Sequence, residues 1–168
     1  MLARVLEGRP HTWFSVSATT RPARPGELEG KDYLFVSEAQ FEDWLANDGL
    51  LEWARVHKQY YGTPRAAVEQ RLREGISVFL DIDTQGAFQV METMPEAISI
   101  FIEPPTMEDL ERRLRRRGTE CGEQLRTRLA AADHEMARKM RYTYRLVNDD
   151  VAVATDELRR IIDSEEAK

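Results

Sequence analysis

The sequence contains a single cysteine, Cys121, among its 168 residues. One cysteine cannot form a disulfide within the chain, which is typical of proteins in a reducing compartment. The first residues, MLARVLEGRP, lack the apolar core of a signal peptide. No apolar run approaches the roughly 20 residues that a membrane-spanning helix needs. We therefore expect a cytoplasmic protein.

Lysine is scarce as well, with four lysines against 20 arginines, and the formal net charge is -6. A chain with this excess of acidic residues is poorly suited to general binding of nucleic acid or of a membrane surface. We predict neither partner. Any site for an anion must then be local.

Histidine is also rare, and His11, His57 and His134 do not have the spacing of metal ligands. We predict no metal site made by the protein alone. Cys121 has no histidine nearby in the sequence, which argues against a catalytic thiol.

Apolar runs alternate with amphipathic segments along the whole chain. We expect strands at 14–17, 33–36, 50–57, 76–82, 97–102 and 144–147, and an aromatic turn at 58–63. We expect helices at 1–7, 37–46, 64–74, 84–94, 106–117, 123–140 and 151–162, with Thr63 as the N-cap of the helix that starts at Pro64. This alternation predicts an α/β fold with a mostly parallel sheet in a single domain, in which ligands bind where strands end.

The segment SVSATTRPARPGE, residues 15–27, leads from a strand into a loop that carries two arginines. Arg21 and Arg24 are three positions apart, and Pro22 and Pro25 stiffen the backbone around them. Two guanidinium forks held in this way suit a dianion such as a phosphate monoester. A solvated basic loop is the alternative, and these residues alone favour neither.

Two carboxylates, Glu52 and Asp83, lie at or near the ends of predicted strands. Buried carboxylates need donors, and a purine edge with N–H and NH₂ groups, guanine above all, would supply them. A structural ion pair or a helix cap is the alternative, and for Asp83 alone the cap is favoured. Tyr61 could donate to a phosphate and Thr63 could bond a base, although tyrosines near turns more often only pack.

The run from Arg112 to Arg117 is very basic. Such a run is usually the solvated face of a helix, because successive side chains spread around the helix axis. The functional alternative is a lid that closes on a polyphosphate, with Gly118 as its hinge and Arg128 joining from the next helix.

Six segments follow one another along the chain: SVSATTRPARPGE, GKDYLFV, LLEWARVHKQYYGTP, FLDIDTQGA, FIEPPTMEDLERRLRRRGTE and LVNDD. With this order and spacing the chain resembles guanylate kinase, of the P-loop nucleoside-monophosphate kinase family, from Ser15 nearly to its C-terminus. The resemblance implies a three-layer, P-loop-kinase-like α/β fold, with a GMP-binding region at about 17–75 and a lid at about 112–128. It also implies that the γ-phosphoryl group of ATP, bound with Mg²⁺, is transferred to GMP.

The resemblance implies a role for individual residues as well. It implies that the phosphate of GMP is held by Arg21, Arg24, Tyr33 and Tyr61. It implies that guanine is read by Ser17, Glu52, Thr63 and Asp83. It places Asp81 near the magnesium and its water shell, Asn148 near adenine, and in the lid or at the transferred phosphate Arg113, Arg117 and Arg128.

One departure from the family pattern concerns the P-loop, GxxxxGK[ST], which is absent from these residues. The only Gly-Lys pair is Gly30-Lys31, and Asp32 follows it. We expect that the chain is incomplete, lacks the first strand and the P-loop of the family, and could self-associate to cover the missing strand. The alternative function is a catalytically inactive guanylate kinase-like module that binds GMP or phosphorylated partners.

Overall fold

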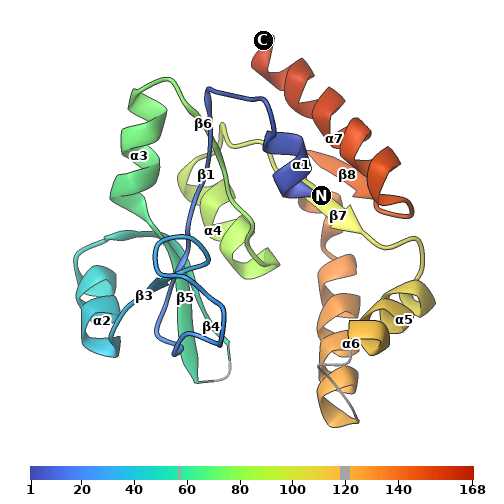
Figure 1. Cartoon of the computed structure of the whole chain (residues 1–168), viewed down its shortest axis with the longest axis horizontal. Coiled ribbons are helices and arrows are strands. Elements are labelled where there is room, and N and C mark those ends of the chain that lie inside the picture. Colours follow the sequence, from blue (N-terminus) through green and yellow to red (C-terminus); the bar gives the residue numbers. More distant parts are fainter. Residues whose placement is uncertain (57, 118–121) are drawn as a thin grey trace. The chain divides into compact units, whose positions relative to one another are not determined.

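The computed structural model of this chain describes residues 1–56, 58–117 and 122–168, without the side chains of Ala3, Arg117 and Gln124. The predictions made for His57, for Gly118 as a hinge and for Cys121 lie outside the described residues. The chain divides into two compact units, one formed by Arg9–Ala97 and the other by Met1–Gly8 with Ile98–Lys168. Figure 1 shows the elements of both units.

The Arg9–Ala97 unit contains a four-stranded sheet in the order β3-β2-β5-β4. Its strands are β2 (Ala18–Thr19), β3 (Leu34–Phe35), β4 (Leu50–Val56) and β5 (Gln59–Pro64). β4 and β5 form an antiparallel hairpin in which Glu52 lies opposite Thr63. β2 pairs antiparallel with β5 and parallel with β3. The sheet is therefore mixed, with β4 at one edge.

The same unit holds a parallel strand pair and three helices. β1 (Thr12–Phe14) pairs with β6 (Ser77–Phe79). The helices are α2 (Glu38–Ala46), α3 (Arg65–Arg73) and α4 (Thr84–Thr93). Phe41 of α2 is completely buried against Ala18 and Leu50, which fixes α2 on the sheet. Local signals set the helix ends: Ser37 Oγ caps α2 by accepting from the Gln40 N–H.

The second unit combines strands and helices in the same manner. Its strands β7 (Ile100–Glu103) and β8 (Tyr144–Val147) are parallel. Its helices are α1 (Leu2–Leu6), α5 (Met107–Arg117), α6 (Glu123–Met136) and α7 (Val151–Glu166), with a short 3₁₀ helix at Lys139–Arg141. Arg159 of α7 donates to the carbonyl of Arg4 and joins α7 to α1. The caps at Thr106 and Asp150 begin α5 and α7 as the sequence predicts.

Several local predictions are wrong. The strands expected at 76–82 and 97–102 lie at Ser77–Phe79 and Ile100–Glu103, and the helix expected at 123–140 ends at Met136. Residues 58–63 do not form an aromatic turn, because Gln59–Pro64 is strand β5. Thr63 does not cap the following helix, whose N-cap is Pro64. The strand expected at 14–17 lies at Thr12–Phe14, and the chain then passes through 15–17 to reach β2. Pairing of β5 with β4 and β2 overrides the turn and cap signals at 58–63, and pairing with β6 sets the bounds of β1.

The α/β class with parallel strand pairs is confirmed. Within the described part of the chain, no helix is long and apolar enough to span a bilayer.

Gly62 is the residue at which the hairpin is packed most tightly. A methyl group at this position would lie 2.8 Å from the carbonyl oxygen of Glu52 and 3.1 Å from both the Phe41 ring and the Trp53 Cβ. The backbone of β4 cannot move away without breaking the ladder. Gly62→Ala should therefore lower the free energy of unfolding by about 1–3 kcal/mol, measured by denaturant titration. Lys58→Ala, at the exposed end of the same hairpin, is the control and should stay within about 0.5 kcal/mol of the wild type.

Candidate functional site

Arg21 is held by an acidic side chain from its own loop. Its two terminal nitrogens each donate to Glu27 at 2.9 Å, so that the pair is bidentate. Glu27 also accepts from the backbone N–H of Arg24 at 2.7 Å. These bonds raise the pKa of Arg21 and lower that of Glu27, in both cases chiefly through the contact between the two side chains. The loop therefore already contains an anion at the arginine fork.

Two tyrosines complete this group. The Arg21 guanidinium lies 5.4 Å from the centre of the Tyr33 ring, and the Tyr33 ring meets the Tyr61 ring edge-on at 6.0 Å. The Tyr61 hydroxyl adds to the raised pKa of Arg21. Arg21 Nε is buried and has no hydrogen-bond acceptor among the described residues. Three of the four residues predicted to hold a phosphate, Arg21, Tyr33 and Tyr61, therefore lie together.

Glu52 is the most deeply buried of the predicted acidic site residues, with 5% of its surface exposed. Its Oε1 accepts from the Thr63 hydroxyl at 2.6 Å, across the β4–β5 hairpin. Its other oxygen faces α4 so closely that a methyl group on Gly86 would overlap it. Burial, together with the nearby Asp83 carboxylate, raises the pKa of Glu52, although the Thr63 bond acts the other way.

Asp83 lies at the N-terminus of α4. Its Oδ1 accepts from the Gly86 N–H at 2.9 Å and caps the helix. The helix-cap interpretation is therefore confirmed for one carboxylate oxygen. A carboxylate has a second oxygen that can accept from a ligand, so the cap and a binding role are compatible.

The remaining predicted site residues of this unit are Ser17, Arg24 and Asp81. The Ser17 carbonyl accepts from the Leu34 N–H just before β2 begins. The Arg24 side chain is exposed on the loop. Asp81 is exposed after β6, yet partial desolvation raises its pKa. Because so much of Asp81 meets solvent, this upward shift carries less weight than that of Glu52.

The two halves of the site share one strand. Tyr61 and Thr63 are two residues apart on β5, so their side chains lie on the same face, about 7 Å apart along the strand. Glu52 lies opposite Thr63 and belongs to that face as well. The hairpin thus presents a buried hydrogen-bond acceptor beside a group containing an arginine and two phenols.

The other unit contains the remaining predicted residues. Arg113 donates to the carbonyls of Asn148 at 2.7 Å and Asp149 at 3.1 Å, which joins α5 to the loop after β8. Asn148 Oδ1 is buried and accepts from no group among the described residues. Arg128 is exposed on α6. Arg117 ends α5, and its side chain lies outside the described part of the structure.

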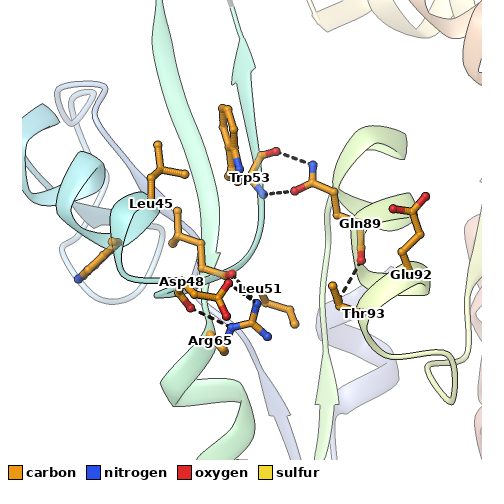
Figure 2. Close-up of a pocket in the computed structure, with 10 residues that line it drawn as sticks. Leu45, Asp48, Leu51, Trp53, Arg65, Gln89, Glu92 and Thr93 are labelled. Carbon is orange, nitrogen blue, oxygen red and sulfur yellow. Dashed lines mark hydrogen bonds and ion pairs between the residues drawn. The ribbon is translucent and has the colours of Figure 1, made fainter.

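A pocket of about 200 Å³ lies between α4 and the β4 edge, and its wall includes Trp44, Trp53 and Arg65. Trp53 follows Glu52 in β4, so its side chain points to the opposite face of the hairpin. Figure 2 shows that Gln89 of α4 reaches the backbone of Trp53 with both atoms of its side-chain amide. Arg65 is bonded to Asp48 on the same side of the pocket.

Sequence reasoning did not assign a role to Glu27 or Gly86. Glu27 belongs to the segment that drew attention to the arginines, six residues after Arg21. The available signal for this pair was an acidic residue that follows two arginines and a glycine. Gly26, with φ of +91°, turns the loop back on itself and so brings Glu27 to Arg21. Gly86 had no comparable signal, since its partner Glu52 is distant in the sequence.

The burial of Glu52 leads to a prediction about how the stability of the folded protein depends on pH. Because its pKa is raised in the folded protein, its contribution to stability is complete below the ordinary value of 4.5 and is lost as the pH rises through the raised pKa. Glu52→Gln should therefore have a higher unfolding midpoint than the wild type at pH 7, and the difference should shrink towards pH 4. Denaturant titrations at the two pH values measure it. Glu92→Gln, exposed on α4, is the control, and a Glu52→Gln protein less stable than the wild type at pH 7 would contradict the assignment.

Comparison with known proteins agrees with this geometry. The family model described as guanylate kinase matches residues 1–165. A guanylate kinase from Gloeobacter violaceus is 48% identical over 162 residues, which cover 96% of this chain and 79% of the relative. A guanylate kinase from a Wolbachia of Brugia malayi is 44% identical over 169 residues, covering 100% and 87%.

A solved structure gives the same result. The crystal structure of guanylate kinase from Anaplasma phagocytophilum aligns with a TM-score of 0.83 and 39% identity, covering 99% of this chain and 81% of that one. The fold, the match of the family model over residues 1–165 and the level of identity all agree. The chain belongs to the guanylate kinase family.

Proposed function

We propose that this chain transfers the γ-phosphoryl group of ATP to GMP. The observation that carries the proposal is the shared face of the β4–β5 hairpin, where a buried carboxylate and the Arg21 group lie side by side. A nucleoside monophosphate has the matching ends, a base with donors and a dianionic phosphate. Family membership selects GMP and ATP among such ligands.

The phosphate of GMP is proposed to bind Arg21, Arg24, Tyr33 and Tyr61. The grouping of the Arg21 guanidinium with the Tyr33 and Tyr61 rings supports this assignment, because it brings a cation and two phenols together. Glu27 holds the guanidinium plane through two bonds before the ligand arrives. Phosphate oxygens then meet an arginine whose orientation is already set.

Guanine is proposed to bind Glu52, Asp83, Ser17 and Thr63. Glu52 and Asp83 are acceptors, and guanine presents N1–H and an NH₂ group along one edge. Adenine presents a bare ring nitrogen at the equivalent position, and it would face a carboxylate lone pair there. Buried polar groups left unpaired in this way account for strong discrimination between substrates.

For the donor we propose Asn148 beside adenine, because a side-chain amide can both donate to and accept from a base. Arg113, Arg117 and Arg128 are proposed to neutralise the transferred phosphoryl group. Mg²⁺ bound with ATP would offset the charge of its phosphates, and Asp81 is proposed as the carboxylate that would accept from the water shell of the ion. Phosphoryl transfer of this kind depends on positioning and charge neutralisation rather than on a covalent intermediate.

The inactive binding module is not favoured by any of these observations. The relatives reported above are named guanylate kinases, and the guanine-binding carboxylate pair would serve no purpose in a site for a phosphorylated side chain.

Catalysis is tested by release of ADP from the purified chain with ATP and Mg²⁺, comparing GMP with AMP. These residues contain no GxxxxGK[ST] motif, so the donor phosphates would have to be held by other groups, such as the arginines of α5 and α6. We expect turnover that depends on GMP and is absent with AMP. A folded chain that releases no ADP with GMP, or as much with AMP, would overturn the proposal.

Binding of GMP by calorimetry tests the acceptor site separately from the donor. Arg21→Ala should weaken GMP binding at least 10-fold and up to about 100-fold, because charge-assisted bonds to phosphate contribute about 1.5–3 kcal/mol. Arg73→Ala, which removes an exposed arginine from α3, should leave the affinity unchanged. Equal affinities of Arg21→Ala and the wild type would show that the phosphate binds elsewhere.

A further inference from the structure

Gln89 binds the backbone of β4 in an unusual way. Its Oε1 accepts from the Trp53 N–H at 3.1 Å, and its Nε2 donates to the Trp53 carbonyl at 2.7 Å (Figure 2). β4 is an edge strand of its sheet. An amide side chain that satisfies both groups of one edge residue takes the place of a neighbouring strand at that point.

This pair fixes α4 against β4 close to Glu52. Trp53 is the residue after Glu52, and Gln89 lies three residues after Gly86, on the same face of α4. The Glu52 side chain lies so close to Gly86 that a Cβ atom there would overlap Glu52 Oε2. The helix is therefore held at Trp53 by hydrogen bonds and touches the buried carboxylate one turn earlier.

The N-terminal turn of α4 also carries the second carboxylate. Asp83 caps the helix through the Gly86 N–H, so its position follows that of α4. Asp83 is near enough to Glu52 to raise its pKa, and the two like charges repel. Because Asp83 moves with α4, the Gln89–Trp53 hydrogen bonds that hold α4 to β4 also help to fix Asp83 relative to Glu52.

We infer that Gln89 is a positioning residue for guanine recognition: it sets the spacing of Glu52 and Asp83 through its two hydrogen bonds to the Trp53 backbone. The inference rests on the proposed function, because it assumes that both carboxylates accept from one base. Two acceptors can bind two neighbouring donors of a rigid ring only at one spacing. Loosening that spacing should reduce selection of the base more than binding of the phosphate.

The test compares the binding of GMP with that of inosine monophosphate, which has the same sugar and phosphate but lacks the 2-amino group. Gln89→Met keeps the length of the side chain and removes both hydrogen bonds. We expect the ratio of the inosine monophosphate Kd to the GMP Kd to fall about tenfold, mainly because GMP binds more weakly. Glu92→Ala, three residues after Gln89 on α4 and exposed, is the matched control and should keep the wild-type ratio.

The outcomes separate the two proposals. A wild type that does not prefer GMP overturns the proposed function and this inference with it. A wild type that prefers GMP, with the same ratio in a folded Gln89→Met protein, overturns the inference alone. If Gln89→Met does not fold, Gln89→Glu takes its place: it retains an acceptor for the Trp53 N–H and loses the donor, and an unchanged ratio there would equally overturn the role of Gln89.

Discussion

The buried carboxylate of Glu52 is the constraint on which the architecture of the Arg9–Ala97 unit depends. A carboxylate removed from water needs donors, and the protein supplies the hydroxyl of Thr63 from the neighbouring strand. To bring it there, the hairpin must pair Glu52 with Thr63, and Gly62 must be small enough for the strands to approach. Gly86 must lack a side chain so that α4 can lie against the same group. Two strands and a helix thus pack closely around the Glu52 carboxylate. Its remaining capacity to accept hydrogen bonds is proposed to be used by the substrate.

Helix positions were predictable from the sequence because their signals are local. Ser37 and Asp150 cap helices within three residues of their own positions, and Gly75, with φ of +73°, follows the end of α3. The strand β8 was also predicted at its observed bounds, since a short apolar segment followed by Asn-Asp-Asp contains both its pattern and its end.

The hairpin was predicted only in part, because its second strand is defined by distant partners. The segment KQYYGT contains a glycine and two phenols, which locally indicate a turn, but β4 and β2 pair with it on both sides. Thr63 illustrates the competition well. Its hydroxyl could have capped the next helix, and instead it donates to a carboxylate 11 residues earlier in the chain, which removes a larger desolvation cost. Residue types at the site were recognisable from the sequence, whereas the contacts made by Gly86 and Gln89 depend on tertiary packing.

The pair of Arg21 and Glu27 has a consequence for small inorganic anions. An open arginine fork would attract chloride, sulfate or free phosphate, all of which surround a protein in solution. Here the fork already faces a tethered carboxylate whose effective concentration is far above that of any dissolved ion. A free anion must displace the Glu27 carboxylate by its charge alone. A ligand that is also bound at a second point brings its phosphate to the arginine at a comparably high local concentration. If the arginines bind the phosphate of GMP as proposed, Glu27 would make them selective for anions that are held elsewhere by the rest of their molecule.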